Sequence, residues 1–181
     1  MSAERVIHNL ALIGFMGTGK SSVGRQLAHL LNFRFIDTDE LIEEQAGRKI
    51  SAIFTEEGET RFREYEREVV AEISSLRHCV ISTGGGLGAN ESNLASLKSH
   101  AMVFCLWASA ESIWERVRNQ DHRPLLRKPD PLKEIERLLT EREPTYRQAD
   151  VLVNTELRSV KEVAAQVLHQ FRAAQRRHAE P

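Results

Sequence analysis

The sequence predicts an α/β fold in which helices cover both faces of a five-stranded parallel sheet. Short apolar runs alternate with amphipathic stretches, as strands and helices do in such sheets. A glycine-rich loop directly follows the first apolar run and precedes a helix-like stretch. The 181 residues are 41% hydrophobic and 28% charged, which suits a single globular domain over residues 1–181.

Five apolar runs of strand length define the expected sheet. They cover residues 6–13, 33–37, 79–83, 101–107 and 151–154. Between and after these runs, apolar residues recur every three or four positions, which predicts helices. The helical stretches cover residues 23–31, 113–117, 132–139 and 160–171.

Charge and cysteine content exclude several classes of protein. A net charge of −1 gives no general attraction to nucleic acid or to an anionic membrane. No apolar stretch reaches the ~20 residues of a membrane span, and the first residues lack the pattern of a signal peptide. Cys79 and Cys105 lie inside apolar runs, as reduced, buried cysteines do. We expect a cytoplasmic protein without nucleic-acid or membrane partners.

The glycine-rich loop is the most informative motif. Residues 14–21 read G-F-M-G-T-G-K-S, which fits the complete phosphate-loop pattern. A strand before the loop and a helix after it aim backbone N–H groups at a nucleotide's phosphates. Lys20 adds a positive charge, and the Ser21 hydroxyl can reach Mg²⁺. The expected nucleotide-binding residues here are Gly17, Thr18, Gly19, Lys20, Ser21 and Ser22.

Two aspartates follow the second predicted strand, and ligands of open α/β sheets bind beyond the carboxyl ends of strands. Asp37 could hold Mg²⁺ through water, while Asp39 accepts a hydrogen bond or proton from an acceptor hydroxyl. One of the two could instead cap the helix expected to begin near Glu40, because aspartate is a favoured N-cap residue.

A carboxylate interrupts an apolar helical stripe in the segment that follows. Glu66 lies four residues after Phe62 on this stripe. A carboxylate there is costly unless it is paired or faces a polar pocket, and Arg63 is close enough to pair with it. Alternatively, Glu66 reaches solvent at the edge of the stripe and Arg63 pairs with Glu59 on the surface.

Two later segments are further candidates for a substrate site. Gly84, Gly85 and Gly86 follow the third predicted strand, where their backbone could approach a polar substrate, or they could form a flexible turn. Arg147 could bind a carboxylate with two parallel hydrogen bonds, or it could be a charge at a helix end.

A proline-rich segment, residues 119–131, is the candidate for a mobile lid. It contains three prolines among charged residues and has no hydrophobic period, so a loop is expected. As a lid it could bring Arg123 to the phosphates and exclude water. The alternative is a plain surface connection.

Together these segments resemble the shikimate kinase family, whose members phosphorylate the 3-hydroxyl of shikimate with ATP in the chorismate and aromatic amino-acid pathway. The resemblance runs from the phosphate loop to the last predicted helix. The phosphate loop alone occurs in many nucleotide-binding proteins, so the resemblance depends on the segments after it. These are residues 37–39, 47–48, 53–54, 62–63, 84–86, 123–126 and 144–147.

The resemblance implies a role for each candidate residue. The residues implied to bind shikimate are Asp39, Phe54, Phe62, Arg63, Glu66, Gly84, Gly85, Gly86 and Arg147. Arg63 and Arg147 would hold its carboxylate. Ser21 and Asp37 would hold Mg²⁺, and Arg118, Arg123 and Arg158 would contact the nucleotide. Lys20, Asp39 and Arg123 would be the catalytic residues.

The fold implied by the resemblance is a three-layer P-loop fold. It has a five-stranded parallel sheet, a helical substrate-binding subdomain at about residues 40–73 and a mobile lid at 119–131. ATP and shikimate would be the partners of a monomer, with Mg²⁺ as cofactor. Another small-molecule kinase, acting on gluconate or a nucleoside monophosphate, is the nearest alternative. A nucleotide-driven switch is disfavoured because the chain lacks an N-K-x-D motif and Asp39 would have no role.

Overall fold

Five parallel strands form a single sheet in the computed structural model, which describes residues 7–119 and 128–177. The strands are β1 (Asn9–Ile13), β2 (Arg34–Asp37), β3 (Cys79–Ser82), β4 (Ala101–Trp107) and β5 (Val151–Asn154). Their order is β2-β3-β1-β4-β5, and every neighbouring pair is parallel. Each strand lies within its predicted range, so the predicted α/β fold with a five-stranded parallel sheet is confirmed.

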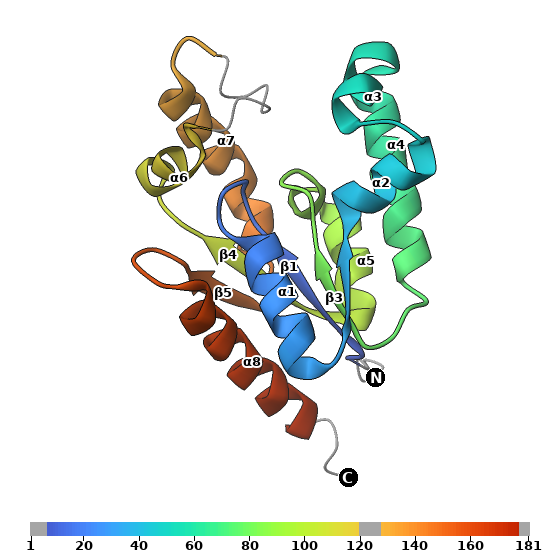
Figure 1. The fold of residues 1–181 in the computed structure, drawn as a ribbon, viewed down its shortest axis with the longest axis vertical. Helices are drawn as coiled ribbons and strands as arrows, with labels where there is room; N and C mark the ends of the chain where they lie inside the picture. The colour runs from blue at the N-terminus through green and yellow to red at the C-terminus, as the bar shows by residue number, and fades with distance from the viewer. Residues whose placement is uncertain (1–6, 120–127, 178–181) are drawn as a thin grey trace.

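Helices cover both faces of this sheet (Figure 1). They are α1 (Lys20–Leu31), α2 (Thr38–Ala46), α3 (Ile50–Glu56), α4 (Gly58–Ile73), α5 (Glu91–His100), α6 (Ala110–Val117), α7 (Pro131–Tyr146) and α8 (Val160–Arg177). A short 3-10 turn, η1 (Leu87–Ala89), follows β3. Among the described residues, no helix combines the length and apolar character needed to cross a membrane.

The central strand β1 is buried on both faces, which explains its continuous apolar sequence. Leu10 and Leu12 face α1 and α8, and Ala11 and Ile13 face the cluster formed with α4 and α5. Side chains of a strand alternate between the two faces, so one short run supplies both halves of the core. A third cluster, around Phe15, joins the phosphate loop to α6 and α7.

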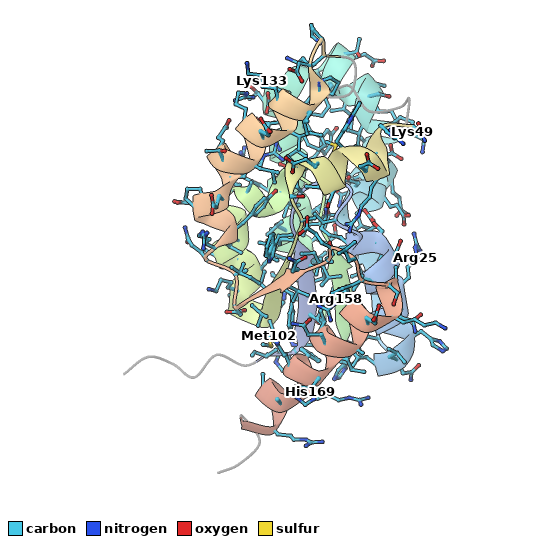
Figure 2. The ribbon with its side chains drawn as sticks, turned by 90° about the vertical axis from the view of Figure 1, so that its left-hand side faces the viewer. Arg25, Lys49, Met102, Lys133, Arg158 and His169 are labelled. Carbon is cyan, nitrogen blue, oxygen red and sulfur yellow. The ribbon has the colours of Figure 1, made fainter. Side chains whose placement is uncertain are left out.

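Two groups of helices stand on either side of the strands' carboxyl ends. Figure 1 shows α2, α3 and α4 on one side and α6 and α7 on the other. In the side view of Figure 2, Lys49 beside α3 and Lys133 on α7 lie at one end of the molecule, and Met102 and His169 lie toward the other. The loops between these helix groups therefore lie where a ligand site is expected.

Helix α5 was not predicted, because its sequence is mostly polar. Only Leu94 and Leu97 pack into the core from its interior. The helix begins with a local signal instead, since the Asn90 side chain accepts a hydrogen bond from the N–H of Asn93 at 3.1 Å.

A buried asparagine fastens the amino end of the sheet. The Asn9 side chain is fully buried; its Oδ1 accepts from the N–H of Cys79 at 3.0 Å, and its Nδ2 donates to the carbonyl of Leu76 at 2.8 Å. Its Nδ2 also lies 3.0 Å from Nδ1 of His100. One side chain thus ties β1 to the start of β3 and to the end of α5.

Replacing this asparagine should destabilise the fold. We expect Asn9→Ala to lower the free energy of unfolding by about 2–4 kcal/mol, because buried backbone groups lose their hydrogen-bond partners. Urea unfolding at neutral pH measures the loss. A change below about 0.5 kcal/mol, the range of ordinary surface substitutions, would contradict this role.

Candidate functional site

The phosphate loop joins β1 to α1 at the carboxyl edge of the sheet. Gly19 occupies the N-cap position of α1, so the cap has no side chain between the helix's first amides and an anion. Lys20 is 7% exposed, and its Nζ donates to the carbonyl of Phe15 at 2.8 Å. A cavity of about 310 Å³ lies in front of the loop, lined by Gly17, Gly19, Lys20, Ser21 and Ser22 among others.

Asp37 caps helix α2 and also contacts the phosphate loop. Its Oδ1 accepts from the N–H of Asp39 at 3.0 Å and caps α2, which begins at Thr38 rather than near Glu40. Its Oδ2 accepts from the Ser21 hydroxyl at 3.0 Å. Hydroxyl and carboxylate oxygens suit Mg²⁺. No group of three or more His, Cys, Asp or Glu side chains in the described ranges could hold a metal alone, so a bound ion would also need phosphate or water oxygens.

The three glycines after β3 bring charged side chains against bare backbone. The N–H of Gly84 donates to the Thr38 hydroxyl at 2.9 Å. A Cβ on Gly84 would lie 2.2 Å from Oδ1 of Asp39, and one on Gly86 would lie 2.7 Å from Nη1 of Arg63. A side chain at Gly84 would therefore displace Asp39, and one at Gly86 would press on Arg63.

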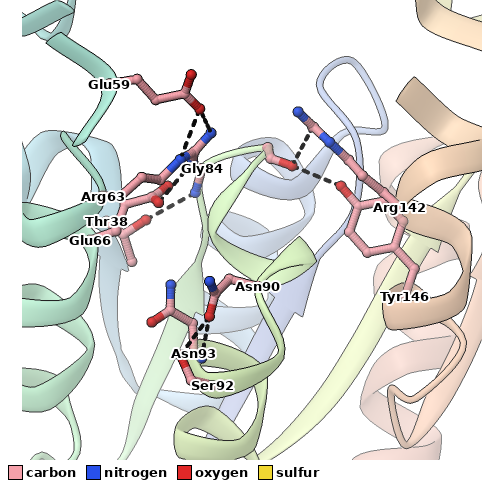
Figure 3. A network of polar contacts seen from close by, with 11 residues as sticks. Thr38, Glu59, Arg63, Glu66, Gly84, Asn90, Ser92, Asn93, Arg142 and Tyr146 are labelled. Carbon is pink, nitrogen blue, oxygen red and sulfur yellow. Dashed lines mark hydrogen bonds and ion pairs between the residues drawn. The ribbon is translucent and has the colours of Figure 1, made fainter. Parts of the chain in front are cut away.

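Both sequence alternatives for Arg63 occur together on α4. Its Nη1 donates to Oε2 of Glu66 at 2.8 Å, and its Nη2 donates to Oε1 of Glu59 at 2.8 Å (Figure 3). Glu66 is 1% exposed, so it is buried together with the apolar stripe on which the sequence places it. Burial raises the pKa of Glu66, while the hydrogen bond and charge of Arg63 and the charge of Arg142 oppose that rise.

Arg142 of α7 faces Arg63 across the glycine segment, and the sequence analysis missed it. Its Nη1 donates to the carbonyl of Gly85 at 3.0 Å, and the Tyr146 hydroxyl donates to the same oxygen at 2.7 Å (Figure 3). Arg63, Gly86 and Arg142 line a cavity of about 450 Å³. The available signal was helical spacing, since Arg142 continues the buried stripe of Ile135 toward Tyr146.

The structure places Arg147 apart from Arg63, although the sequence analysis assigned both to one carboxylate. The Arg147 side chain is 66% exposed and pairs with Glu143, its Nη2 lying 2.6 Å from Oε1. It lines a separate cavity of about 470 Å³ beside Trp107 and Leu152. Among the described residues, this cavity and that of Arg63 have no lining residue in common. Arg147 follows the last residue of α7 and points away from the glycines because it is one position past the buried stripe.

The other side of the phosphate loop adjoins a smaller cavity of about 220 Å³. Arg158, predicted near adenine, lines it together with Thr18 and Thr155. Arg118, predicted there too, is an exposed residue at the end of α6 and is not part of this lining. Arg116 lines the cavity instead. Arg116 and Arg158, and not Arg118, therefore lie together in the wall of this cavity.

Phe54 and Phe62 do not line the cavities described above. Phe62 is buried and Phe54 is exposed, and their ring centres lie 4.6 Å apart. Neither ring lines the 450 Å³ cavity, although Arg63 lies 5.5 Å from the centre of the Phe62 ring. Arg123 and most of the predicted lid, residues 120–127, lie outside the described residues.

The cavities of about 220, 310 and 450 Å³ lie along the carboxyl edge. The 220 Å³ and 310 Å³ cavities share Gly17, Gly19, Ser22 and Arg116. The 310 Å³ cavity reaches Gly84 and Gly85, and the 450 Å³ cavity begins at Gly86. Arginines thus lie at both ends, with a lysine and two aspartates between them. Such a site can align a nucleotide with a small anionic acceptor for phosphoryl transfer.

Comparisons with known sequences agree with this geometry. The family model described as shikimate kinase matches residues 16–172. The shikimate kinase of Thermodesulfovibrio yellowstonii is 43% identical over 163 residues, which cover 90% of this chain and 94% of that protein. The shikimate kinase of Deinococcus radiodurans is 43% identical over 168 residues, covering 93% of this chain and 85% of that protein.

Solved structures give the same result. The shikimate kinase from Acinetobacter baumannii in complex with shikimate has a TM-score of 0.88 and 34% identity, covering 94% of this chain and 96% of its own. A gluconokinase from Sinorhizobium meliloti has a TM-score of 0.63 at 17% identity, covering 97% of this chain and 98% of its own. The second likeness extends to the fold alone.

Proposed function

The chain belongs to the shikimate kinase family, and we propose that it phosphorylates the 3-hydroxyl of shikimate with ATP by using the residues around its phosphate loop and glycine segment. The observation that carries this assignment of residues is the pair of arginines, Arg63 on α4 and Arg142 on α7, that line one cavity beside the phosphate loop. A ring carboxylate is the natural partner of two converging guanidinium groups.

Acceptor binding is assigned to the 450 Å³ cavity and the glycine segment. Arg63 and Arg142 hold the carboxylate of shikimate, which fixes the ring and directs one hydroxyl toward Asp39. Glu66 keeps Arg63 oriented through a buried 2.8 Å hydrogen bond. We include the helices α2, α3 and α4 in a substrate-binding subdomain, because α2 and α4 supply Asp39 and Arg63.

The phosphate loop and Asp39 perform the transfer itself. Lys20 stabilises charge on the transferring phosphoryl group, and the N–H groups at the start of α1 hold the phosphates. Asp39 positions the acceptor hydroxyl in line and takes up its proton, as Gly84 allows its carboxylate to reach the cavity. Holding both reactants in one series of cavities replaces an encounter in solution. Arg123 remains a predicted phosphate contact.

Mg²⁺ is proposed as the cofactor, with Ser21 and Asp37 as its protein-side partners. When bound, the ion neutralises part of the charge on the β- and γ-phosphates. We also propose a cytoplasmic monomer, and sedimentation velocity would check the oligomeric state. Buried, unpaired cysteines at positions 79 and 105 are consistent with a reducing compartment.

A coupled assay of ADP release tests the proposed activity. Shikimate, gluconate and AMP are offered separately at equal concentration with ATP and Mg²⁺. Turnover is expected with shikimate and only background with the other two. Stimulation by gluconate or AMP in place of shikimate would refute the assignment of the acceptor.

The two arginines of the α7 region give a matched pair for substitution. Arg142→Ala should raise the KM for shikimate by roughly 30- to 1,000-fold, corresponding to about 2–4 kcal/mol for a desolvated charge pair. The KM for ATP should stay within about twofold, because Arg142 contacts the glycine segment rather than the purine end. Initial rates at varied shikimate and varied ATP measure both constants.

Arg147→Ala is the matched control. Arg147 lies five residues after Arg142, directly after the end of α7, and its guanidinium group is exposed. The kinetic constants of this variant should be those of the unsubstituted enzyme. If Arg147→Ala raised the KM for shikimate and Arg142→Ala did not, the correction drawn from the structure would be wrong.

The metal role of Asp37 has a test that preserves the helix cap. Asp37→Asn keeps an oxygen for the N–H of Asp39 but removes the negative charge beside Ser21. The Mg²⁺ concentration for half-maximal rate should rise about 10- to 100-fold, the range seen when groups that support a metal are changed. Rates at fixed ATP and varied Mg²⁺ measure it, with the melting temperature as the check on folding. An unchanged Mg²⁺ dependence would exclude Asp37 from the metal site.

A further inference from the structure

The loop between β5 and α8 is fastened to both ends of helix α6 by two consecutive residues. At the start of α6, Oε1 of Glu156 accepts from the N–H of Ser109 at 2.9 Å and from the Ser112 hydroxyl at 2.8 Å. At the other end, Arg116 donates to the carbonyl of Thr155 at 2.8 Å and to its hydroxyl at 3.0 Å. Residues from both ends of this short helix are therefore bonded to the same loop.

The contact at Glu156 is electrostatically favourable. A carboxylate at a helix N-terminus meets the positive end of the helix dipole and accepts from amides that the helix itself leaves without partners. Hydrogen bonds from Ser109 and then Ser112 lower the pKa of Glu156 to about 2. The group is therefore ionised throughout the neutral pH range.

The same loop is held to the sheet by its backbone. The N–H of Thr155 donates to the carbonyl of Trp107 at 3.0 Å, and the N–H of Glu156 donates to Oδ1 of Asn154 at 2.7 Å. These bonds direct the Glu156 side chain toward α6. The shape of the loop is therefore held by bonds other than those to α6.

This clamp reaches the nucleotide end of the site through Arg116. In addition to Thr155, Arg116 donates to the carbonyl of Gly17 in the phosphate loop at 3.2 Å. Arg116, Thr155 and Arg158 all line the 220 Å³ cavity, but they come from two separate elements. Their mutual position depends on how the loop sits against α6. Glu156 does not line that cavity, so any effect it has passes through these neighbours.

We propose that Glu156 is a positioning residue for the nucleotide, which locks the β5–α8 loop onto the start of α6 and so sets Arg116 and Thr155 around the base. This inference rests on the proposed function and adds to it that the base of ATP lies in the 220 Å³ cavity, beside the phosphate loop. The phosphates lie in the neighbouring cavity, which Thr155 and Arg158 do not line and where Arg116 keeps its own hydrogen bond to the carbonyl of Gly17.

Kinetics and binding of two nucleotide-side ligands test the proposal. Glu156→Ala should raise the KM for ATP roughly tenfold, as expected for lost hydrogen bonds to a charged group, while kcat and the KM for shikimate stay within about twofold. By calorimetry, affinity for ADP should fall similarly. Affinity for inorganic tripolyphosphate, which has no base, should stay within about twofold. Glu156→Gln keeps an oxygen for Ser109 and Ser112 and should recover most of the ADP affinity.

Glu162 offers a matched control at the start of α8. Its carboxylate accepts from the N–H and the hydroxyl of Ser159 at 2.7 and 2.6 Å, the same kind of contact, but within its own helix. Glu162→Ala should leave both KM values unchanged. Melting temperatures of all variants show whether each is folded. If Glu156→Ala is not, Ser112→Ala carries the test, because it removes one of the two donors to Glu156 and should show part of the loss of ADP affinity.

Arg116→Ala distinguishes two ways in which the proposal could fail: in the positioning of the nucleotide by Glu156, or in the placement of the base of ATP in the 220 Å³ cavity. If Arg116→Ala raises the KM for ATP and Glu156→Ala, or Ser112→Ala in its place, does not, the positioning role is overturned and the nucleotide placement stands. If Arg116→Ala leaves the KM for ATP unchanged, the placement fails and the inference fails with it. Equal losses for ADP and tripolyphosphate in Glu156→Ala would show a general structural effect and would also overturn the proposal.

Discussion

Contact between bare backbone and charged side chains at Gly84, Gly85 and Gly86 is the constraint on which the acceptor end depends. Gly84 binds the Thr38 hydroxyl of α2, and the Gly85 carbonyl accepts from Arg142 and Tyr146 of α7. Helix α4 brings Arg63 beside Gly86 from the opposite side. Helices α2, α4 and α7 therefore all contact one short segment at the end of β3.

The buried carboxylate of Glu66 is explained by the same arrangement. Taking a carboxylate out of water costs several kcal/mol, and an ion pair in the interior returns only part of that cost. Glu66 therefore contributes little to net stability through its pair with Arg63. Its effect is to hold Nη1 of Arg63 in place, so that the guanidinium group faces the cavity. Glu59 binds Nη2 less firmly, because an exposed carboxylate can exchange its partner for water.

The sequence was sufficient for features that depend on local patterns. Strand positions, the phosphate loop and the helix cap at Asp37 follow from apolar runs, glycine spacing and capping preference, which act over a few residues. Strand order did not follow, because periodicity reports burial and not which strands are neighbours. Helix α5 was missed because it has few apolar residues in its interior.

Arginines were the least predictable part of the site. Arg142 and Arg147 both lie in one charged segment, as Arg116 and Arg118 do in another, and residue type alone does not distinguish the members of either pair. What separates Arg142 from Arg147 is the angular position on α7 relative to the buried side chains. That angle is fixed only when the boundaries of the helix and its packing partners are known.

The two hydrogen bonds to the Gly85 carbonyl also restrict how the chain can vary in length. Each residue added to an α-helix rotates everything beyond it by roughly 100°. A single insertion between Ile135 and Arg142 would turn Arg142 and Tyr146 off the glycine segment together, and no side-chain change could restore both. The spacing from Ile135 to Tyr146 must therefore stay constant if both hydrogen bonds to Gly85 are to be kept, whereas the connections before Pro131 and after Tyr146 carry no such requirement.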